Sequence, residues 1–265
     1  MRYEYGVSEL DVLVVSSHAP DLEAFGSALG RHLSGELRGL RVQAKSVGIG
    51  LAGVSGTLVA RMADAPPKAV VLVGTCAAYP GRNLSVGQVV VAERLVVADG
   101  AVLKGWAAFP DPMTGVIEPH RVMTSALAST GTRRVTVAST LAVTLDPSLA
   151  QAFSAQLRCD VEHQEAFGVA LACAPMHVPC AIVLGVSHEV GPAARETWRV
   201  SHRQAAVAAS TLVLSWLQAG GAGVPHGEAR GRLAPGQNVP SRAADGESVN
   251  PFTLASIPHS APCAS

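Results

Sequence analysis

Polar side chains able to move a proton stand directly after two apolar runs of this sequence. The run "CAIVLGVS" ends at Ser187, and His188 and Glu189 follow it, whereas Asp21 comes shortly after "DVLVVSSH". An imidazole gains or loses a proton near neutral pH, and a carboxylate can deprotonate water, so these residues suit acid–base chemistry. Two plainer interpretations stay open: Ser187–Glu189 as a strand tip turning into solvent, and Asp21 with Glu23 as acids in the first turn of a helix.

Small residues form a second candidate group after another apolar run. The segment "GTCAA", residues 74–78, follows "AVVLV", and small side chains allow backbone N–H groups to approach a ligand closely. The alternative is an ordinary turn, as it is for "VGIG" at residues 47–50. The stretch "GTCAAYPG" lacks both the G-x-G-x-x-G pattern and the G-x-x-x-x-G-K phosphate loop, which argues against the two commonest nucleotide sites there.

A third group stands ahead of an apolar, helix-like segment. "DVEHQEAFGVALAC" places Glu162, His163 and Glu165 before that segment. Acids at this place stabilise the positive end of a helix, so a capping cluster is the alternative to a binding site. No further ligand appears at a matching spacing, so we predict no metal and no cofactor.

The elements that must position these groups alternate between apolar runs and alanine-rich segments. Five runs have the continuous hydrophobicity of strands buried on both faces, at residues 11–17, 69–74, 87–100, 134–140 and 180–187. Five segments have the length and composition of helices, at residues 21–34, 53–64, 147–158, 164–173 and 195–218. We predict an α/β fold, a single-domain α/β/α sandwich with a central, mostly parallel, mixed sheet. Ligands gather at the carboxyl ends of such strands, where the polar residues described above are expected.

The character of the chain changes near residue 220. Residues 220–265 are dense in Gly, Pro, Ser and Ala and offer too little apolar surface to offset the entropy of ordering. We therefore predict one functional domain over residues 1–219, followed by a disordered tail over residues 220–265.

Composition narrows the possible partners. Of 265 residues, 48% are hydrophobic, and the 15% that are charged balance to a net charge of zero, so no basic surface for nucleic acid is expected. No apolar run approaches the roughly 18–20 residues of a membrane span. The five cysteines (76, 159, 173, 180 and 263) stand singly, which fits a reducing cytoplasm. A small neutral or mildly anionic ligand is the expected partner.

The order of these motifs resembles the purine nucleoside phosphorylase and nucleosidase superfamily over residues 11 to about 216. "VGIGLAGVSGTLVARM" is similar to its "tGvGkvnAA" segment, and "VLVGTCAAYPGRNLSVGQVVVAERLVVADG" to its glycine turn and following strand. The C-terminal half resembles futalosine hydrolase. There "VEHQEAFGVA" parallels "VEnMEgaavA", and "VSHEVGPAARETWRVSHRQA" parallels "iSN-x-VgpRdR-x-x-W-x-i-x-x-A", with Ser187 and Trp198 matched.

The resemblance implies a role for each matched residue. Glu165 stands at the glutamate that binds the ribose, and Gln164 at the neighbouring methionine. Asp21 would orient and deprotonate an attacking water. His188 occupies the place of an asparagine or aspartate that contacts the base, and we expect it to contact the departing base. The other expected substrate-binding residues are Gly74, Thr75, Cys76 and Ser187.

Two departures from the family pattern indicate hydrolysis rather than phosphorolysis. Leu72 stands where phosphorolytic relatives carry an arginine, and "SSHAPDLE" replaces their glycine- and arginine-containing phosphate loop. A phosphate dianion would lack its bidentate partners, so water is the expected nucleophile.

The resemblance predicts a cytoplasmic enzyme of menaquinone biosynthesis that converts futalosine and water to hypoxanthine and dehypoxanthine futalosine. The alternatives are a methylthioadenosine/adenosylhomocysteine-type nucleosidase, a purine nucleoside phosphorylase, or a nucleoside-binding pseudoenzyme. We expect a homo-oligomer, a dimer or larger, because relatives complete the pocket with a neighbour's aromatic residue. Trp106 and Phe109 are candidates for that part, or else ordinary core or interface residues.

Overall fold

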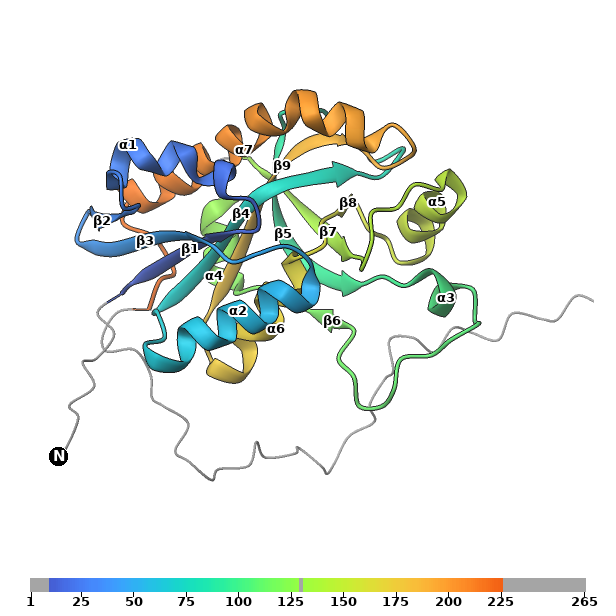
Figure 1. Ribbon diagram of the computed structural model, residues 1–265, viewed down its shortest axis with the longest axis horizontal. Helices are drawn as coiled ribbons and strands as arrows, with labels where there is room; N and C mark the ends of the chain where they lie inside the picture. The colour runs from blue at the N-terminus through green and yellow to red at the C-terminus, as the bar shows by residue number, and fades with distance from the viewer. Residues whose placement is uncertain (1–9, 129–130, 226–265) are drawn as a thin grey trace, which may run out of the picture. The chain divides into compact units, whose positions relative to one another are not determined.

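The computed structural model describes residues 10–128 and 131–225, which all belong to one compact unit (Figure 1). Most of the predicted tail, residues 226–265, lies outside the described residues. None of the helices within the described ranges is both long and apolar enough to cross a membrane.

One mixed sheet of nine strands organises the described chain. The strands are β1 (Val12–Ser16), β2 (Ser34–Leu37), β3 (Leu40–Ser46), β4 (Ala69–Ala78), β5 (Val89–Val97), β6 (Val116–Ile117), β7 (Arg133–Ser139), β8 (Val161–Glu162) and β9 (Cys180–Glu189). Their order is β2-β3-β1-β4-β8-β7-β5-β6, and β9 pairs with both β4 and β5. The pairings of β4, β9, β5, β7 and β8 therefore close into a ring. Most pairs among β1, β3, β4, β5, β7, β8 and β9 are parallel, and β9 runs antiparallel to β5.

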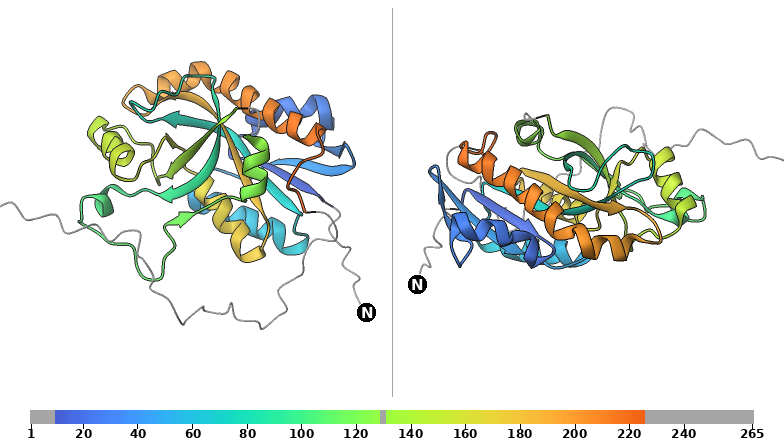
Figure 2. Two further views of the ribbon diagram at one scale, coloured as in Figure 1. Left: turned by 180° about the vertical axis from the view of Figure 1, so that it is seen from behind. Right: turned by 90° about the horizontal axis from the view of Figure 1, so that it is seen from above.

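Helices cover both faces of the sheet. The α-helices are α1 (Gly26–Leu29), α2 (Leu51–Asp64), α3 (Gly100–Leu103), α4 (Arg121–Leu127), α5 (Pro147–Gln156), α6 (Ala166–Cys173) and α7 (Ala194–Gln218), and the 3₁₀ helices are η1 (Ala19–Phe25) and η2 (Ala174–Met176). In Figure 1, α2 and α6 lie below the sheet, and α1 and α7 lie above it. Figure 2 shows the same two layers from behind, and in the view from above α7 runs across the sheet. The predicted α/β/α sandwich is confirmed.

Alternate residues of the central strands supply the two hydrophobic cores, as their continuous hydrophobicity predicts. Leu13 and Leu72 pack toward α2 and α6. Val12 and Val71, one residue earlier on the same strands, pack toward η1, α4 and α7. Each strand is thereby buried on both faces.

The prediction of one helix over residues 21–34 is wrong. A 3₁₀ helix, η1, runs to Phe25, α1 ends at Leu29, and β2 begins at Ser34. Gly30 ends the helical stretch with a φ of 73°, a conformation that glycine adopts without the steric cost paid by other residues. The other four predicted helices exist, with ends shifted by up to two residues.

The described chain continues beyond the predicted domain end at residue 219. Val224 is buried beside α4 and α7. The indole N–H of Trp216 donates to the carbonyl of Ala222, at 3.2 Å. Residues 220–225 therefore pack against the same core as α7.

Candidate active site

A cavity of about 510 Å³ opens where β4, β8 and β9 end and η1, α6 and α7 begin. The sequence-predicted residues that line it are Asp21, Thr75, Gln164, Glu165 and His188. They come from four places spread over most of the chain, because Gln164 and Glu165 are neighbours. The fold brings them together because the carboxyl ends of parallel strands meet at one edge of the sheet.

Three other predicted residues lie behind the cavity wall. Cys76 is 2% exposed, and burial raises the pKa of its thiol above the usual range, so it is a core residue. Ser187 is fully buried, and its hydroxyl donates to the carbonyl of Cys76 at 3.1 Å. The absence of a side chain at Gly74 leaves room for His163 and Asp21. A Cβ at this position would lie 3.3 Å from Nε2 of His163 and 3.7 Å from Oδ2 of Asp21.

Asp21 is a buried carboxyl group with three polar neighbours. It is 5% exposed, and burial raises its pKa, while hydrogen bonds from His18 and Ser16 oppose this. Nδ1 of His18 lies 3.2 Å from Oδ1, and the Ser16 hydroxyl donates to Oδ2 at 3.2 Å. Ser210 of α7 donates to the backbone carbonyl of Asp21 at 2.8 Å and fastens η1 to that helix.

His163 is a neutral imidazole of fixed orientation. Its Nδ1 accepts from the backbone N–H groups of Glu165 and Ala166, at 3.3 and 3.1 Å. Burial lowers its pKa, which the neighbouring Glu165 and Asp21 partly oppose. Nδ1 also lies 3.5 Å from Oε2 of Glu165, but an accepting nitrogen forms no ion pair. The ring proton is therefore on Nε2, beside Gly74 and Asp21.

Glu165 stands between two helix starts. It is 5% exposed and caps α6, and its Oε1 accepts from the backbone N–H of Gly50 at 2.8 Å. Gly50 precedes α2 with a φ of 80°, which favours glycine. The turn "VGIG" thus holds the Glu165 carboxylate, while Ile49, 77% exposed, lies at the cavity rim.

Glu162 organises the wall opposite η1. Its Oε2 accepts from the Tyr79 hydroxyl at 2.9 Å, and its Oε1 accepts from the backbone N–H of Thr144 at 2.9 Å. The amide of Gln164 donates to the same Oε1 at 3.2 Å. Because its oxygens are used within the protein, Glu162 shapes the loop that carries Val143 and Leu145 to the cavity.

Aromatic rings gather on the α7 side of the cavity. The indole N–H of Trp198 donates to the hydroxyl of Thr75 at 3.2 Å. His202 stacks on Trp198 with ring centres 4.2 Å apart, and His18 meets Trp198 edge-on at 5.6 Å. This packing holds a flat apolar surface beside Thr75, which suits a planar ligand. Trp106, weighed in the sequence analysis, is not among the lining residues and is 76% exposed.

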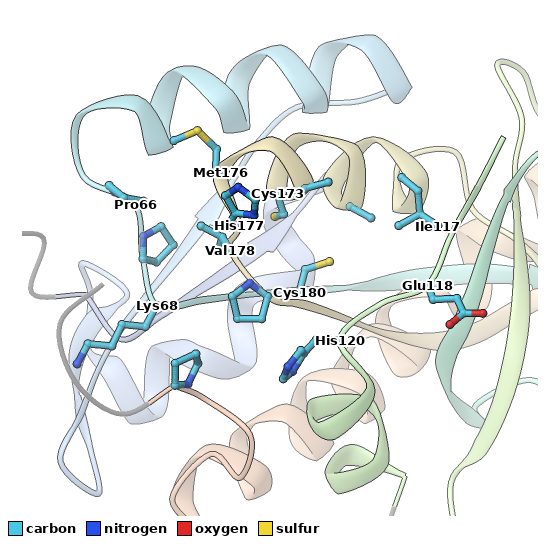
Figure 3. A pocket seen from close by; sticks show the side chains of 15 residues that line it. Pro66, Lys68, Ile117, Glu118, His120, Cys173, Met176, His177, Val178 and Cys180 are labelled. Atoms are coloured by element: carbon cyan, nitrogen blue, oxygen red, sulfur yellow. The ribbon is translucent and has the colours of Figure 1, made fainter. Parts of the chain in front are cut away.

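A second hollow of about 620 Å³ lies at the opposite ends of β4 and β9 (Figure 3). Cys173 and Cys180 face it, and a hydrogen bond with Cys180 together with burial raises the pKa of Cys173 well above its usual value. None of the predicted site residues lines this hollow. Over residues 10–128 and 131–225, no three His, Cys, Asp or Glu side chains are placed to hold a metal ion.

Sequence reasoning missed several residues of the cavity. The sequence pattern around His163 indicates only a capping cluster, and the approach of its ring to Gly74 depends on how β8 and β4 align. His18 and Gly50 carried no pattern that distinguished them from turn residues. A histidine three residues before Asp21 was the available signal, because groups at this spacing meet on a helical turn.

Comparison with known proteins identifies the class. The sequence matches the family described as the phosphorylase superfamily over residues 6–217, and the chain belongs to that family. The superfamily membership predicted from the motifs is confirmed. No curated protein matches the sequence.

Solved structures of nucleosidases share the fold. A 5′-methylthioadenosine/S-adenosylhomocysteine nucleosidase of Helicobacter pylori, bound to butyl-thio-DADMe-Immucillin-A, superposes with a TM-score of 0.71 at 13% identity, over 78% of this chain and 97% of that one. Futalosine hydrolase of Helicobacter pylori strain 26695 gives the same four values. The nucleosidase of Neisseria meningitidis, in complex with methylthio-immucillin-A, gives 0.68 at 18% identity, over 78% and 98%.

Proposed function

We propose that the protein hydrolyses the N-ribosidic bond of a purine nucleoside. The observation that carries this proposal is that Asp21, Glu165 and His188 line one cavity in a chain of the phosphorylase superfamily. Water attacks C1′, the C1′–N9 bond breaks, and the base leaves with the bonding electron pair and gains a proton.

The cavity residues suit the charges that develop in this reaction. The sugar becomes positively charged in the transition state, and carboxylates close to it stabilise that charge. Glu165 accepts hydrogen bonds from ribose hydroxyls, while Gly50 holds one of its oxygens in place. Asp21 takes a proton from the attacking water. Its hydrogen bonds from Ser16 and His18 favour the ionised form, against the effect of burial on its pKa.

The charges around the cavity support hydrolysis over phosphorolysis. Arg195 is the one lysine or arginine among the described residues that line it, and its side chain is exposed. Leu72, at the place of the phosphorolytic arginine, is fully buried in the core below the sheet. A phosphate dianion would therefore find no buried bidentate partner.

Futalosine, which carries hypoxanthine, is the first candidate substrate because the motifs of the C-terminal half resemble futalosine hydrolase. Adenine nucleosides such as methylthioadenosine are the alternative. The place in menaquinone biosynthesis, the cytoplasmic location and the homo-oligomer stay predictions.

The test is to follow release of free base by chromatography. The protein is incubated with futalosine, inosine and methylthioadenosine, each with and without phosphate. We expect base release without phosphate. Strict dependence on phosphate would overturn the hydrolase assignment, and saturable binding without release would favour a nucleoside-binding pseudoenzyme.

Asp21→Asn is the matched variant, since it keeps the shape of the side chain and removes the base. We expect turnover to fall by about 10²–10⁴-fold, the contribution typical of a positioned acid or base. Asp146→Asn, at an exposed cap of α5, serves as the control. Unchanged turnover of Asp21→Asn would remove Asp21 from the mechanism.

A further inference from the structure

We propose that Ser187 fixes the tautomer of His188, so that Nε2 accepts a hydrogen bond and the site selects a 6-aminopurine over a 6-oxopurine. The inference rests on the proposed function for the identity of the ligand as a purine nucleoside. It makes His188 a specificity-determining residue and Ser187 a positioning residue.

An irregularity in β9 places these two side chains. β9 runs parallel to β4 with Cys76 beside Val186 and Ala77 beside His188, so Ser187 is an extra residue, as in a β-bulge. A bulge turns the following side chain relative to a regular strand. His188 consequently lines the cavity while Ser187 is fully buried.

Hydrogen bonds hold the bulge from both sides. The Ser187 hydroxyl donates to the carbonyl of Cys76 on β4, at 3.1 Å. The hydroxyl of Ser201 on α7 donates to the backbone carbonyl of Ser187. Both contacts are made where the regular ladder is interrupted, so the position of Ser187 is fixed by two neighbouring elements.

The proton count then assigns the tautomer. The Ser187 oxygen lies 2.8 Å from Nδ1 of His188. A serine hydroxyl has one proton to donate, and here it goes to the Cys76 carbonyl. Turning that proton toward Nδ1 would give up the bond to a buried carbonyl, which is costly. Nδ1 is therefore the donor, and Nε2 carries the lone pair.

The open edge of the imidazole is Nε2. His188 is 9% exposed, and no described residue bonds to this nitrogen. Burial lowers the pKa of His188 and favours the neutral ring. The other titratable or charged groups of the cavity are Asp21 on η1, Glu162 on β8, His163 and Glu165 before α6, His18 before η1, and Arg195 on α7. Burial is the one cause that shifts the pKa of His188, so none of these groups forces a second proton onto the ring.

A lone pair at this place distinguishes the two kinds of purine. The edge of adenine offers N7 as an acceptor and the 6-amino group as a donor, whereas the edge of a 6-oxopurine offers two acceptors, N7 and O6. The 6-amino group can donate to Nε2 of His188. A 6-oxopurine would face it with acceptors alone. The proposal therefore favours an adenine nucleoside over futalosine.

The test compares two nucleosides that differ only at position 6. Methylthioadenosine and methylthioinosine have the same sugar and 5′ group, and kcat/KM is measured for each at pH 7.5 without phosphate. We expect the 6-amino compound to be favoured about tenfold to a hundredfold, the range for one mismatched hydrogen bond in a desolvated site. Equal values, or a preference for methylthioinosine, would overturn the proposal.

Ser187→Ala tests the positioning role. Without the hydroxyl, Nδ1–H loses its acceptor, the ring can take the other tautomer, and the preference should fall to within about threefold of unity. The readout is the ratio between two substrates, which a general loss of stability would not change. Ser125→Ala is the control and should keep the wild-type ratio, because Ser125 is a half-buried serine of α4 that accepts a hydrogen bond from Arg134 and does not line the cavity. An unchanged ratio in Ser187→Ala contradicts the proposal.

Measurements of binding distinguish a failure of the tautomer assignment from a failure of the proposed hydrolysis. The affinities of 9-methyladenine and 9-methylhypoxanthine, in which N7 is fixed as an acceptor, are measured by calorimetry on the full chain. Tighter binding of 9-methyladenine supports the assignment of His188 even if no nucleoside is hydrolysed. Equal binding, or binding of neither base, overturns it whether or not turnover is found.

Discussion

Burial and hydrogen bonding shift the pKa of Asp21 in opposite directions. Its side chain is nearly inaccessible, which raises its pKa, and the contact with His18 is the largest opposing influence. The proposed base must be ionised to accept a proton, so the pH range of the proposed reaction depends on this balance. We therefore expect His18, half-buried at the cavity, to influence that pH range without transferring a proton itself.

We predict that His18→Ala moves the acid limb of the pH profile to higher pH. Removal of the hydrogen bond and the charge that lower the pKa of Asp21 leaves burial less opposed, so the pKa of Asp21 rises. The carboxylate then protonates at a higher pH as the solution is acidified. The measurement is kcat/KM between pH 5 and 9, where activity should fall more at the acid end than at pH 8.

His32→Ala is the control for this profile, because His32 is exposed and outside the cavity. It should keep the wild-type profile. A uniform loss of activity in His18→Ala at every pH would show that His18 contributes only to binding or packing.

At the scale of elements, the long apolar runs were predictable and the polar, irregular segments were not. The continuous hydrophobicity of β4 and β9 indicated strands buried on both faces, and both cores confirm it. The segment that forms β3 was missed although "LRVQAKS" alternates between buried and exposed residues. Its apolar side chains are few and short, so the two-residue period was weak.

The residues of the site, like the strands, could be predicted from the sequence only in part. The positions of Asp21, Glu165 and His188 followed from strand ends and from the resemblance. The hydrogen bond from the backbone N–H of Gly50 to Glu165 joins the start of α2 to the start of α6, 115 positions apart in the sequence. Such contacts depend on the register and crossing of elements, which local patterns do not specify.

The packing of α7 on β9 depends on one residue without a side chain. A Cβ at Gly185 would lie 2.0 Å from the carbonyl oxygen of Ala205 and 2.5 Å from its carbonyl carbon. These are backbone atoms, so the helix would have to move. Because α7 also carries Ser201 and Ser210, its position matters to both β9 and η1.

We predict that Gly185→Ala destabilises the protein by about 1–3 kcal/mol or more, the cost typical of overpacking a core. The measurement is the free energy of unfolding in urea. Gly56→Ala is the matched control, since a Cβ there meets nothing within 4 Å and Gly56 is exposed on α2. It should be neutral or stabilising by up to about 1 kcal/mol because alanine favours helix. Equal stability of Gly185→Ala and wild type would mean that α7 adjusts without cost.

At the scale of the whole molecule, both ends of the described chain reach the same site. Asp21 follows β1, the first strand, while His188 is the next-to-last residue of β9, the last strand. The hydrogen bond from Ser210 to the Asp21 carbonyl connects the last helix to η1 across 189 positions of sequence. Asp21 and His188 can therefore come together only once the sheet and α7 are complete.

The segment that follows α7 also contacts the core, and two truncated chains test whether these contacts stabilise the protein. A chain ending at residue 225 keeps Val224, which is 3% exposed, and the Ala222 carbonyl that accepts from Trp216. A chain ending at residue 219 loses both. We expect the first truncation to unfold at the same urea concentration as the full chain. The second should be less stable by about 2–3 kcal/mol, the scale of one buried valine and one hydrogen bond.

The stabilities of the two truncated chains show at which residue the cooperatively folding unit ends. If both truncations match the full chain, the predicted boundary at residue 219 holds energetically and the contacts of Val224 contribute little. If both are destabilised, residues beyond 225 contribute to the fold. The expected result, a loss of stability only in the shorter chain, would move the boundary to residue 225, because Val224 belongs to the same buried cluster as Trp216 of α7.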